Sequence, residues 1–107
     1  MTTEQKPICI LIVDDHPLLR EGIAALIGVE PDMEVAAEAP TGREGITQFK
    51  LKRPDVTLMD LQMPDMGGIE AIIAIRGEFP NARIIVLTTY AGDVQVLRAL
   101  NGDSGAR

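Results

Sequence analysis

Apolar positions along the chain alternate between the spacing of strands and that of helices. Solid apolar runs at residues 8–13 and 84–87 predict strands buried on both faces, and residues 56–59 predict a third strand of this kind. Residues 33–39 carry few bulky side chains and predict a weaker strand near a sheet edge. Because Cys9 lies inside the first run, we expect a buried core thiol.

Between the first three strands, apolar residues recur at helical spacing. Pro17 suits the first turn of one helix and Gly28 can end it. Its apolar stripe is Leu19, Ile23, Leu26 and Ile27. Thr41 and Glu44 have the spacing of a capping box for a second helix, and residues 53–55 stop it. Its inward residues are Ile46 and Phe49.

The second half continues the alternation. A loop at residues 61–68 leads into a helix with the apolar residues Ile69, Ile72 and Ile73. Pro80-Asn81 signals a turn before the fourth strand, and Asp93 can cap a last helix carrying Val96, Leu97 and Leu100. Successive strand–helix units predict an α/β fold, a doubly wound parallel sheet with right-handed crossovers. We expect one domain at 8–100, between an N-terminal tail (1–7) and a flexible C-terminal tail (101–107).

Polar residues follow three of the apolar strands, where doubly wound sheets bind their ligands. Asp14 and Asp15 follow the first strand, Asp60 the third and Thr88 the fourth. If the first and third strands are neighbours, the three carboxylates converge, so that one takes up a proton or the group recruits a cation. Oxygen ligands with retained water favour Mg²⁺. Each acid taken alone is equally compatible with a turn former or helix cap.

Composition narrows the possible functions. The 107 residues are 46% hydrophobic, which suits one globular domain and is too apolar for a disordered tail. The net charge of −6 argues against direct binding of DNA or of anionic lipid. A single cysteine excludes an internal disulfide and a multi-cysteine metal site. With no signal peptide or membrane-length apolar run, we expect a cytoplasmic protein.

Three segments together resemble the receiver domain of response regulators, which has the flavodoxin-like (CheY-like) fold. They are ILIVDDHPLLREG (residues 10–22), DVTLMDLQMPDMGG (residues 55–68) and IIVLTTY (residues 84–90). The first is similar to the NarL/FixJ-like branch in particular. The resemblance implies a phosphoacceptor domain of a two-component transcriptional regulator, not an enzyme, whose partner is a sensor histidine kinase.

The resemblance also implies a role for each site residue. Asp60 would accept the phosphoryl group. Asp15 and Asp60 would bind Mg²⁺ directly, Asp14 through water, and the backbone carbonyl of Gln62 would add a ligand. A divalent ion can neutralise the phosphoryl oxygens during transfer.

Further residues around this site have less specific interpretations. Thr88 would be the switch hydroxyl, and Tyr90 is either a mobile aromatic beside it or a surface residue. His16 could be a catalytic base or a metal ligand. We favour the simpler interpretation, a polar residue at the helix entrance. Pro64 and Gly67-Gly68 either shape the loop over the site or are ordinary loop residues.

The chain departs from the family pattern at its C-terminus. It ends at Arg107, before the lysine, the fifth strand, the fifth helix and the DNA-binding helix-turn-helix domain of full-length relatives. The resemblance implies the strand order 2-1-3-4 for the four strands present. Without the fifth strand and helix, we expect an uncovered fourth strand and a homo-oligomer. The missing lysine favours an alternative, a receiver-like interaction module that is not phosphorylated. A Mg²⁺-dependent phosphohydrolase is disfavoured, because residues 14–16 do not form the Asp-x-Asp motif of haloacid dehalogenases.

Overall fold

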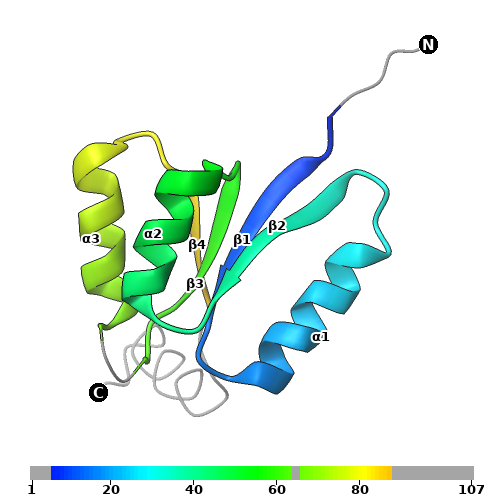
Figure 1. Ribbon diagram of the computed structural model, residues 1–107, viewed down its shortest axis with the longest axis horizontal. Helices are drawn as coiled ribbons and strands as arrows, with labels where there is room; N and C mark the ends of the chain where they lie inside the picture. The colour runs from blue at the N-terminus through cyan, green and yellow to red at the C-terminus, as the bar shows by residue number, and fades with distance from the viewer. Residues whose placement is uncertain (1–5, 64–65, 88–107) are drawn as a thin grey trace, which may run out of the picture.

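A parallel sheet lies between two helical layers in the computed structural model, which describes residues 6–63 and 66–87 (Figure 1). The strands are β1 (Ile8–Val13), β2 (Met33–Ala39), β3 (Val56–Asp60) and β4 (Ile84–Leu87). The helices are α1 (Pro17–Gly28), α2 (Gly42–Lys52) and α3 (Gly68–Glu78). The strand order β2-β1-β3-β4 confirms the predicted order and places β2 at one edge. The predicted helix after Asp93 and the C-terminal tail lie outside the described residues.

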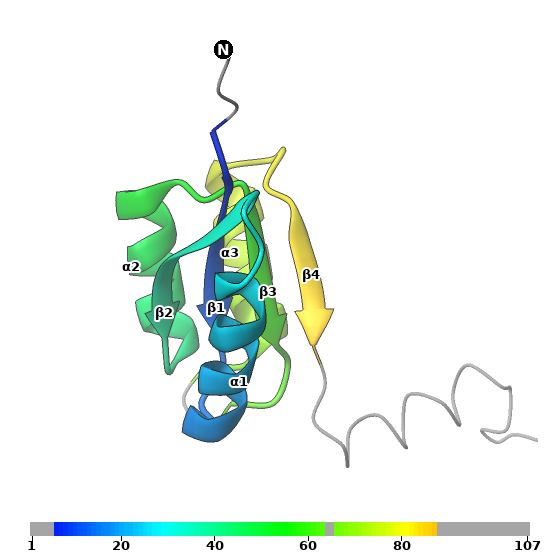
Figure 2. The same ribbon diagram turned by 90° about the vertical axis from the view of Figure 1, so that its right-hand side faces the viewer.

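The direction of each crossover decides which face each helix covers. The chain moves from β1 to β2 in one direction and then back through β3 to β4 in the other. Right-handed connections therefore place α1 on one face and both α2 and α3 on the opposite face (Figures 1 and 2). In the described part of the chain, no helix has the length and apolar composition needed to cross a bilayer.

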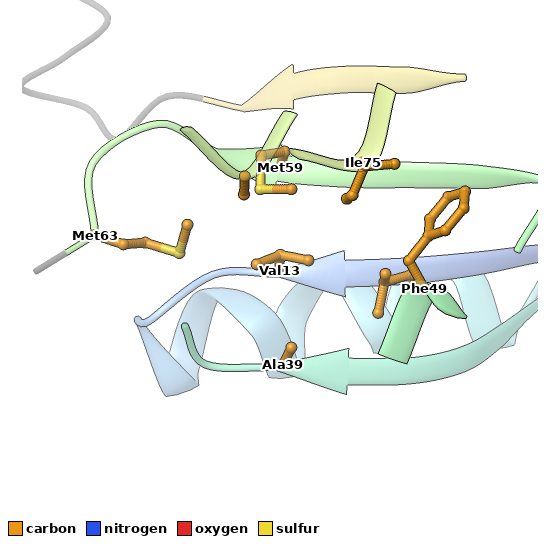
Figure 3. Close-up of a cluster of buried hydrophobic side chains, with 8 residues drawn as sticks. Val13, Ala39, Phe49, Met59, Met63 and Ile75 are labelled. Carbon is orange, nitrogen blue, oxygen red and sulfur yellow. The ribbon is translucent and has the colours of Figure 1, made fainter. Parts of the chain in front are cut away.

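Two hydrophobic clusters, one on each face of the sheet, form the core. Alternate residues of β1 point to opposite faces, so that Leu11 and Val13 join one cluster and Ile10 and Ile12 the other. The larger cluster lies beneath α2 and α3 and contains Leu11, Val13, Ala39, Phe49, Met59, Met63, Ala71 and Ile75 (Figure 3). The smaller cluster joins the sheet to α1 through Ile27.

Two predicted apolar stripes are only partly buried. In α1, Ile27 is buried, but Leu26 is 71% exposed and Leu19 is 39% exposed. In α3, the buried residues are Ala71 and Ile75, whereas Ile69 and Ile73 are exposed. Hydrophobic spacing predicted both helices correctly, but burial also needs a neighbouring layer, and each helix packs along one narrow side only.

The prediction that β4 is fully buried is wrong, because Ile85 and Val86 are 54% and 46% exposed. This strand pairs with β3 alone among the described residues, and Figure 2 shows no labelled helix in front of it. Cys9 is likewise not a core thiol. It lies near the start of β1, partly exposed, with Sγ 3.3 Å from Glu34 Oε2. This hydrogen bond is the main cause that raises the pKa of the Cys9 thiol.

Local signals at the ends of α2 behave as predicted. Thr41 Oγ1 accepts a hydrogen bond from the backbone N–H of Glu44 (3.1 Å), which confirms one half of the capping box. The helix ends where Arg53 adopts a left-handed conformation with φ of 46°. The Phe49 ring packs against Phe79, and the Arg53 guanidinium lies 4.3 Å from the centroid of the Phe79 ring. These contacts join α2 to the segment that follows α3.

The start of α3 lies directly against the backbone that follows β3. A Cβ added to Gly68 would lie 2.7 Å from Leu61 Cα and still closer to the carbonyl oxygen of Asp60. Backbone atoms cannot move aside as a flexible side chain can. Glycine is therefore required at position 68 because there is no room for a Cβ, not because the backbone has an unusual φ.

We predict that Gly68→Ala destabilises the protein by roughly 1–3 kcal/mol, the usual cost of overpacking. Gly77→Ala in the same helix is the matched control, because a Cβ there meets nothing within 4 Å. It should stabilise the helix by about 0.5–1 kcal/mol. Urea unfolding measures both changes, and equal effects of the two substitutions would contradict the steric argument.

Candidate functional site

Three carboxylates converge at the carboxyl edge of the sheet. Asp14 and Asp15 follow β1, and Asp60 is the last residue of the adjacent strand β3. The side chains of Asp14 and Asp60 are both 1% exposed and that of Asp15 is 27% exposed. Oxygen atoms of the three carboxylates and a ring nitrogen of His16 all lie within 4.8 Å of one another. The predicted convergence of the acids is therefore confirmed.

Backbone hydrogen bonds hold the acidic segments in place. The N–H of Asp14 donates to the carbonyl of Ala39 in β2, and its own carbonyl accepts from Arg20 Nη1 at 2.6 Å. On the other side, the N–H of Gln62 donates to Asp60 Oδ1 at 3.1 Å. Arg20, which also pairs with Glu38, was not identified from the sequence, because nothing in its spacing links it to the first strand.

His16 lies at the helix entrance as predicted, but its ring also faces the acids. It is the N-cap residue of α1, and its N–H donates to Asp14 Oδ1 (2.8 Å). Its Nδ1 lies 2.9 Å from Asp14 Oδ1, 3.1 Å from Asp15 Oδ1 and 3.8 Å from Asp60 Oδ2. Its position directly after the two acids was the only sequence signal for this arrangement.

The surroundings of the site shift the pKa values of Asp60 and His16. Burial raises the pKa of Asp60, and the neighbouring charges of Asp14 and Asp15 raise it further. The hydrogen bond from Gln62 and the nearby His16 oppose this shift in part. The pKa of His16 is raised mainly by its hydrogen bond to Asp14 and by the charge of Asp15.

The donor atoms of this cluster fit a divalent cation. Asp15 Oδ1 and Asp60 Oδ2 are buried and accept no hydrogen bond from the described residues. Buried carboxylate oxygens that accept no hydrogen bond are costly, and a cation would supply a compensating interaction. An acidic pocket formed by Asp14, Asp15 and Asp60 can therefore bind a metal ion.

Other predicted site residues are only partly located. Gln62 lies at the site through its N–H, and Gly68 packs against the backbone of Asp60. β4 ends at Leu87, the Cα partner of Asp60. Thr88, Tyr90 and Pro64 lie outside the described residues, so their proposed roles stay predictions.

We predict that Asp60→Asn stabilises the metal-free protein near neutral pH, on the order of 1 kcal/mol, by removing a buried charge beside two others. A carboxyl whose pKa is raised on folding stabilises the fold below its unfolded-state pKa, and this contribution is lost as the pH rises through the folded-state pKa. The stability gained by the variant should therefore grow from about pH 4 upward. Urea unfolding in EDTA measures the difference in the free energy of unfolding. A variant less stable than the wild type at pH 7 would contradict the destabilising role given to the Asp60 charge.

Known proteins resemble this chain over most of its length. The sequence pattern of the response regulator receiver domain matches residues 10–106. The response regulator protein VraR of Staphylococcus saprophyticus is 40% identical over 99 residues, which cover 92% of this chain and 46% of that protein. VraR of Staphylococcus aureus is 39% identical over 94 residues. The chain thus spans about half the length of these curated relatives.

Solved structures agree in fold and in sequence. A two-component response regulator of the LuxR family from Aurantimonas sp. SI85-9A1 matches with a TM-score of 0.76 and 39% identity, covering 94% of this chain and 71% of that one. The signal receiver domain of the putative response regulator NarL from Mycobacterium tuberculosis matches with a TM-score of 0.77 and 29% identity, covering 91% and 78%. With its acids at the carboxyl edge of a sheet of order 2-1-3-4, this chain belongs to the receiver domains of two-component response regulators, which are signalling domains rather than conventional enzymes.

Proposed function

We propose that this receiver domain, for which residues 8–100 are the expected extent, accepts a phosphoryl group on Asp60. The observation that carries the proposal is the placement of this carboxylate. Its Oδ1 is held by the N–H of Gln62, whereas its buried Oδ2 accepts no hydrogen bond from the described residues and lies 3.8 Å from His16 Nδ1. The N–H of Gln62 thus orients the carboxylate of Asp60 within the acidic pocket.

The expected donor is a phosphohistidine of a sensor histidine kinase in the cytoplasm. An Asp60 oxygen attacks the phosphorus atom, the P–N bond breaks, and the imidazole leaves with the bonding electrons and takes up a proton. When bound, Mg²⁺ supplies positive charge that neutralises the phosphoryl oxygens. Asp15 and Asp60 would hold the ion directly, Asp14 through water, and the carbonyl of Gln62 would complete the protein ligands.

The response to phosphorylation is proposed to pass through β4. Leu87 pairs with Asp60, and the N–H of Leu61 donates to the Leu87 carbonyl at 3.4 Å, so this strand is joined to the phosphoacceptor. Thr88 follows directly in the sequence and would bind a phosphoryl oxygen, with Tyr90 as the neighbouring aromatic. This chain is similar to a response regulator of the LuxR family, so in full-length relatives the signal would regulate transcription.

We also propose that the chain self-associates through the α1 side of the sheet. Leu26, Ile85 and Ile8 are 71%, 54% and 41% exposed there. With Ile10, Ile23, Ile27, Met33, Val56 and Leu58, they line a depression that offers no polar surface. Contiguous apolar surface of this kind favours association in water. This property would also serve the alternative function, an interaction module that is not phosphorylated.

Incubation with acetyl phosphate and Mg²⁺ should add the mass of one phosphoryl group to the wild type and none to Asp60→Asn. Asp55→Asn is the matched control, because Asp55 precedes β3 at the opposite end of the sheet and hydrogen-bonds the N–H of Cys9. This variant should be phosphorylated like the wild type. Intact mass spectrometry provides the measurement. A full mass increment in Asp60→Asn would refute the assignment, and none in the wild type would favour the interaction module.

Size exclusion with light scattering at micromolar concentration should show dimers or larger species. Ile85→Lys should shift the protein toward monomer, since it places a charge in the apolar depression. Ile73→Lys is the control, because Ile73 is 66% exposed on α3, on the opposite side of the sheet. A cooperative, well-folded monomer for the wild type would rule out the proposed association.

A further inference from the structure

An imidazole nitrogen completes the group of carboxylate oxygens described above, and the proposed Mg²⁺ ligation does not use it. His16 Nδ1 is the only nitrogen among the four grouped ligand atoms of the described residues. Carboxylate oxygens suit Mg²⁺ and Mn²⁺, whereas imidazole suits Zn²⁺ and other transition ions. The kind of ion that the site prefers therefore depends on whether this nitrogen can reach it.

The distances from His16 Nδ1 to oxygens of Asp14 and Asp15 match those between adjacent ligands of one small ion. Metal–ligand bonds of about 2.1 Å place adjacent octahedral ligands roughly 3.0 Å apart and opposite ones roughly 4.2 Å apart. Nδ1 of His16 lies 2.9 Å and 3.1 Å from oxygens of Asp14 and Asp15. The same nitrogen lies 3.8 Å from Asp60 Oδ2, between the distances expected for adjacent and for opposite ligands.

Independent support comes from the oxygen on the other side of the group. The carboxylate of Asp60 is almost completely buried, and its Oδ2 accepts no hydrogen bond from the described residues although it faces His16. The backbone of His16 is already fixed, because this residue is the N-cap of α1 and its backbone N–H donates to Asp14 Oδ1. The ring is held by the contact of Nδ1 with the same oxygen. Its side chain is 50% exposed, so ligation would cost little additional desolvation.

We propose that His16 Nδ1 is a direct ligand for divalent transition ions, and that it widens the metal preference of this site beyond Mg²⁺ and Mn²⁺, which carboxylates suit, to ions such as Co²⁺ and Zn²⁺. This inference rests on the proposed metal site of the phosphoacceptor. The competing interpretation is that the ring is only a counter-charge to the acids. The two differ in sign: loss of a ligand weakens binding of transition ions selectively, whereas loss of a counter-charge strengthens binding of every divalent ion.

The test is a calorimetric titration of the full chain with CoCl₂ and, separately, with MgCl₂. A Cys9→Ser background removes the thiol near Glu34 as an alternative Co²⁺ ligand. His16→Ala should weaken Co²⁺ binding at least about 10-fold and change Mg²⁺ binding much less. His16→Gln, which keeps a polar side chain at the helix start, should show the same selective loss. Asp15→Asn is the matched control, because it should weaken both metals if both bind at this site.

Pulsed electron paramagnetic resonance of the Mn²⁺-loaded protein gives a second readout. A ¹⁴N coupling from a bound imidazole should appear in the wild type and vanish in His16→Gln. The proposal is overturned if no such coupling appears, if both His16 variants bind both metals more tightly, or if the ratio of Co²⁺ to Mg²⁺ affinity is unchanged. Those results would leave the Mg²⁺ site of the proposed function intact. A wild type that binds neither metal would refute that site as well.

Discussion

Mutual repulsion among three carboxylates is the constraint around which this receiver domain is organised. Two of the side chains, Asp14 and Asp60, are almost completely buried, and like charges held this close oppose folding unless they are compensated. The fold supplies partial compensation from one backbone N–H at Asp60, and from the N–H and the ring of His16 at Asp14. The negative charge that stays uncompensated makes the pocket suited to a cation and, in our proposal, to the transfer of a phosphoryl group.

The backbone of the scaffold brings these charges together. Adjacent parallel strands bring the ends of β1 and β3 to the same edge. The first turn of α3 packs against the segment after Asp60 so tightly that only glycine fits at position 68. Leu61 hydrogen-bonds to the end of β4, so that the acid is joined to an edge strand. The backbone next to the acid is therefore hydrogen-bonded to a strand whose residues Ile85 and Val86 are partly exposed.

The two faces of the sheet differ in how completely they are covered. On one face, α2 and α3 enclose a continuous core that reaches from Phe49 to Met63 beneath the site (Figure 3). On the other face, α1 alone packs on the sheet among the described residues and leaves Ile85 of β4 exposed. The face beneath α2 and α3 is the more completely covered one and supports the geometry of the site, and the α1 face is the one through which we propose self-association. Burial of apolar surface contributes about 25 cal/mol per Å², so covering this surface with another chain would add stability.

Hydrophobic spacing by itself determined the strands and the three described helices, because its period depends on local chemistry. The strand order came from the family resemblance, and the convergence of Asp14, Asp15 and Asp60 depended on that order; the structure confirms both. Thr88, Tyr90 and the carbonyl of Gln62 stay predictions. Only the tertiary structure decided that Cys9 and Ile85 are partly exposed, that α3 buries Ala71 and Ile75, and that His16 faces the acids. The physical reason is that burial and charge contacts depend on which elements pack beside a residue. A periodic pattern describes the residue's own element and carries no information about its neighbours.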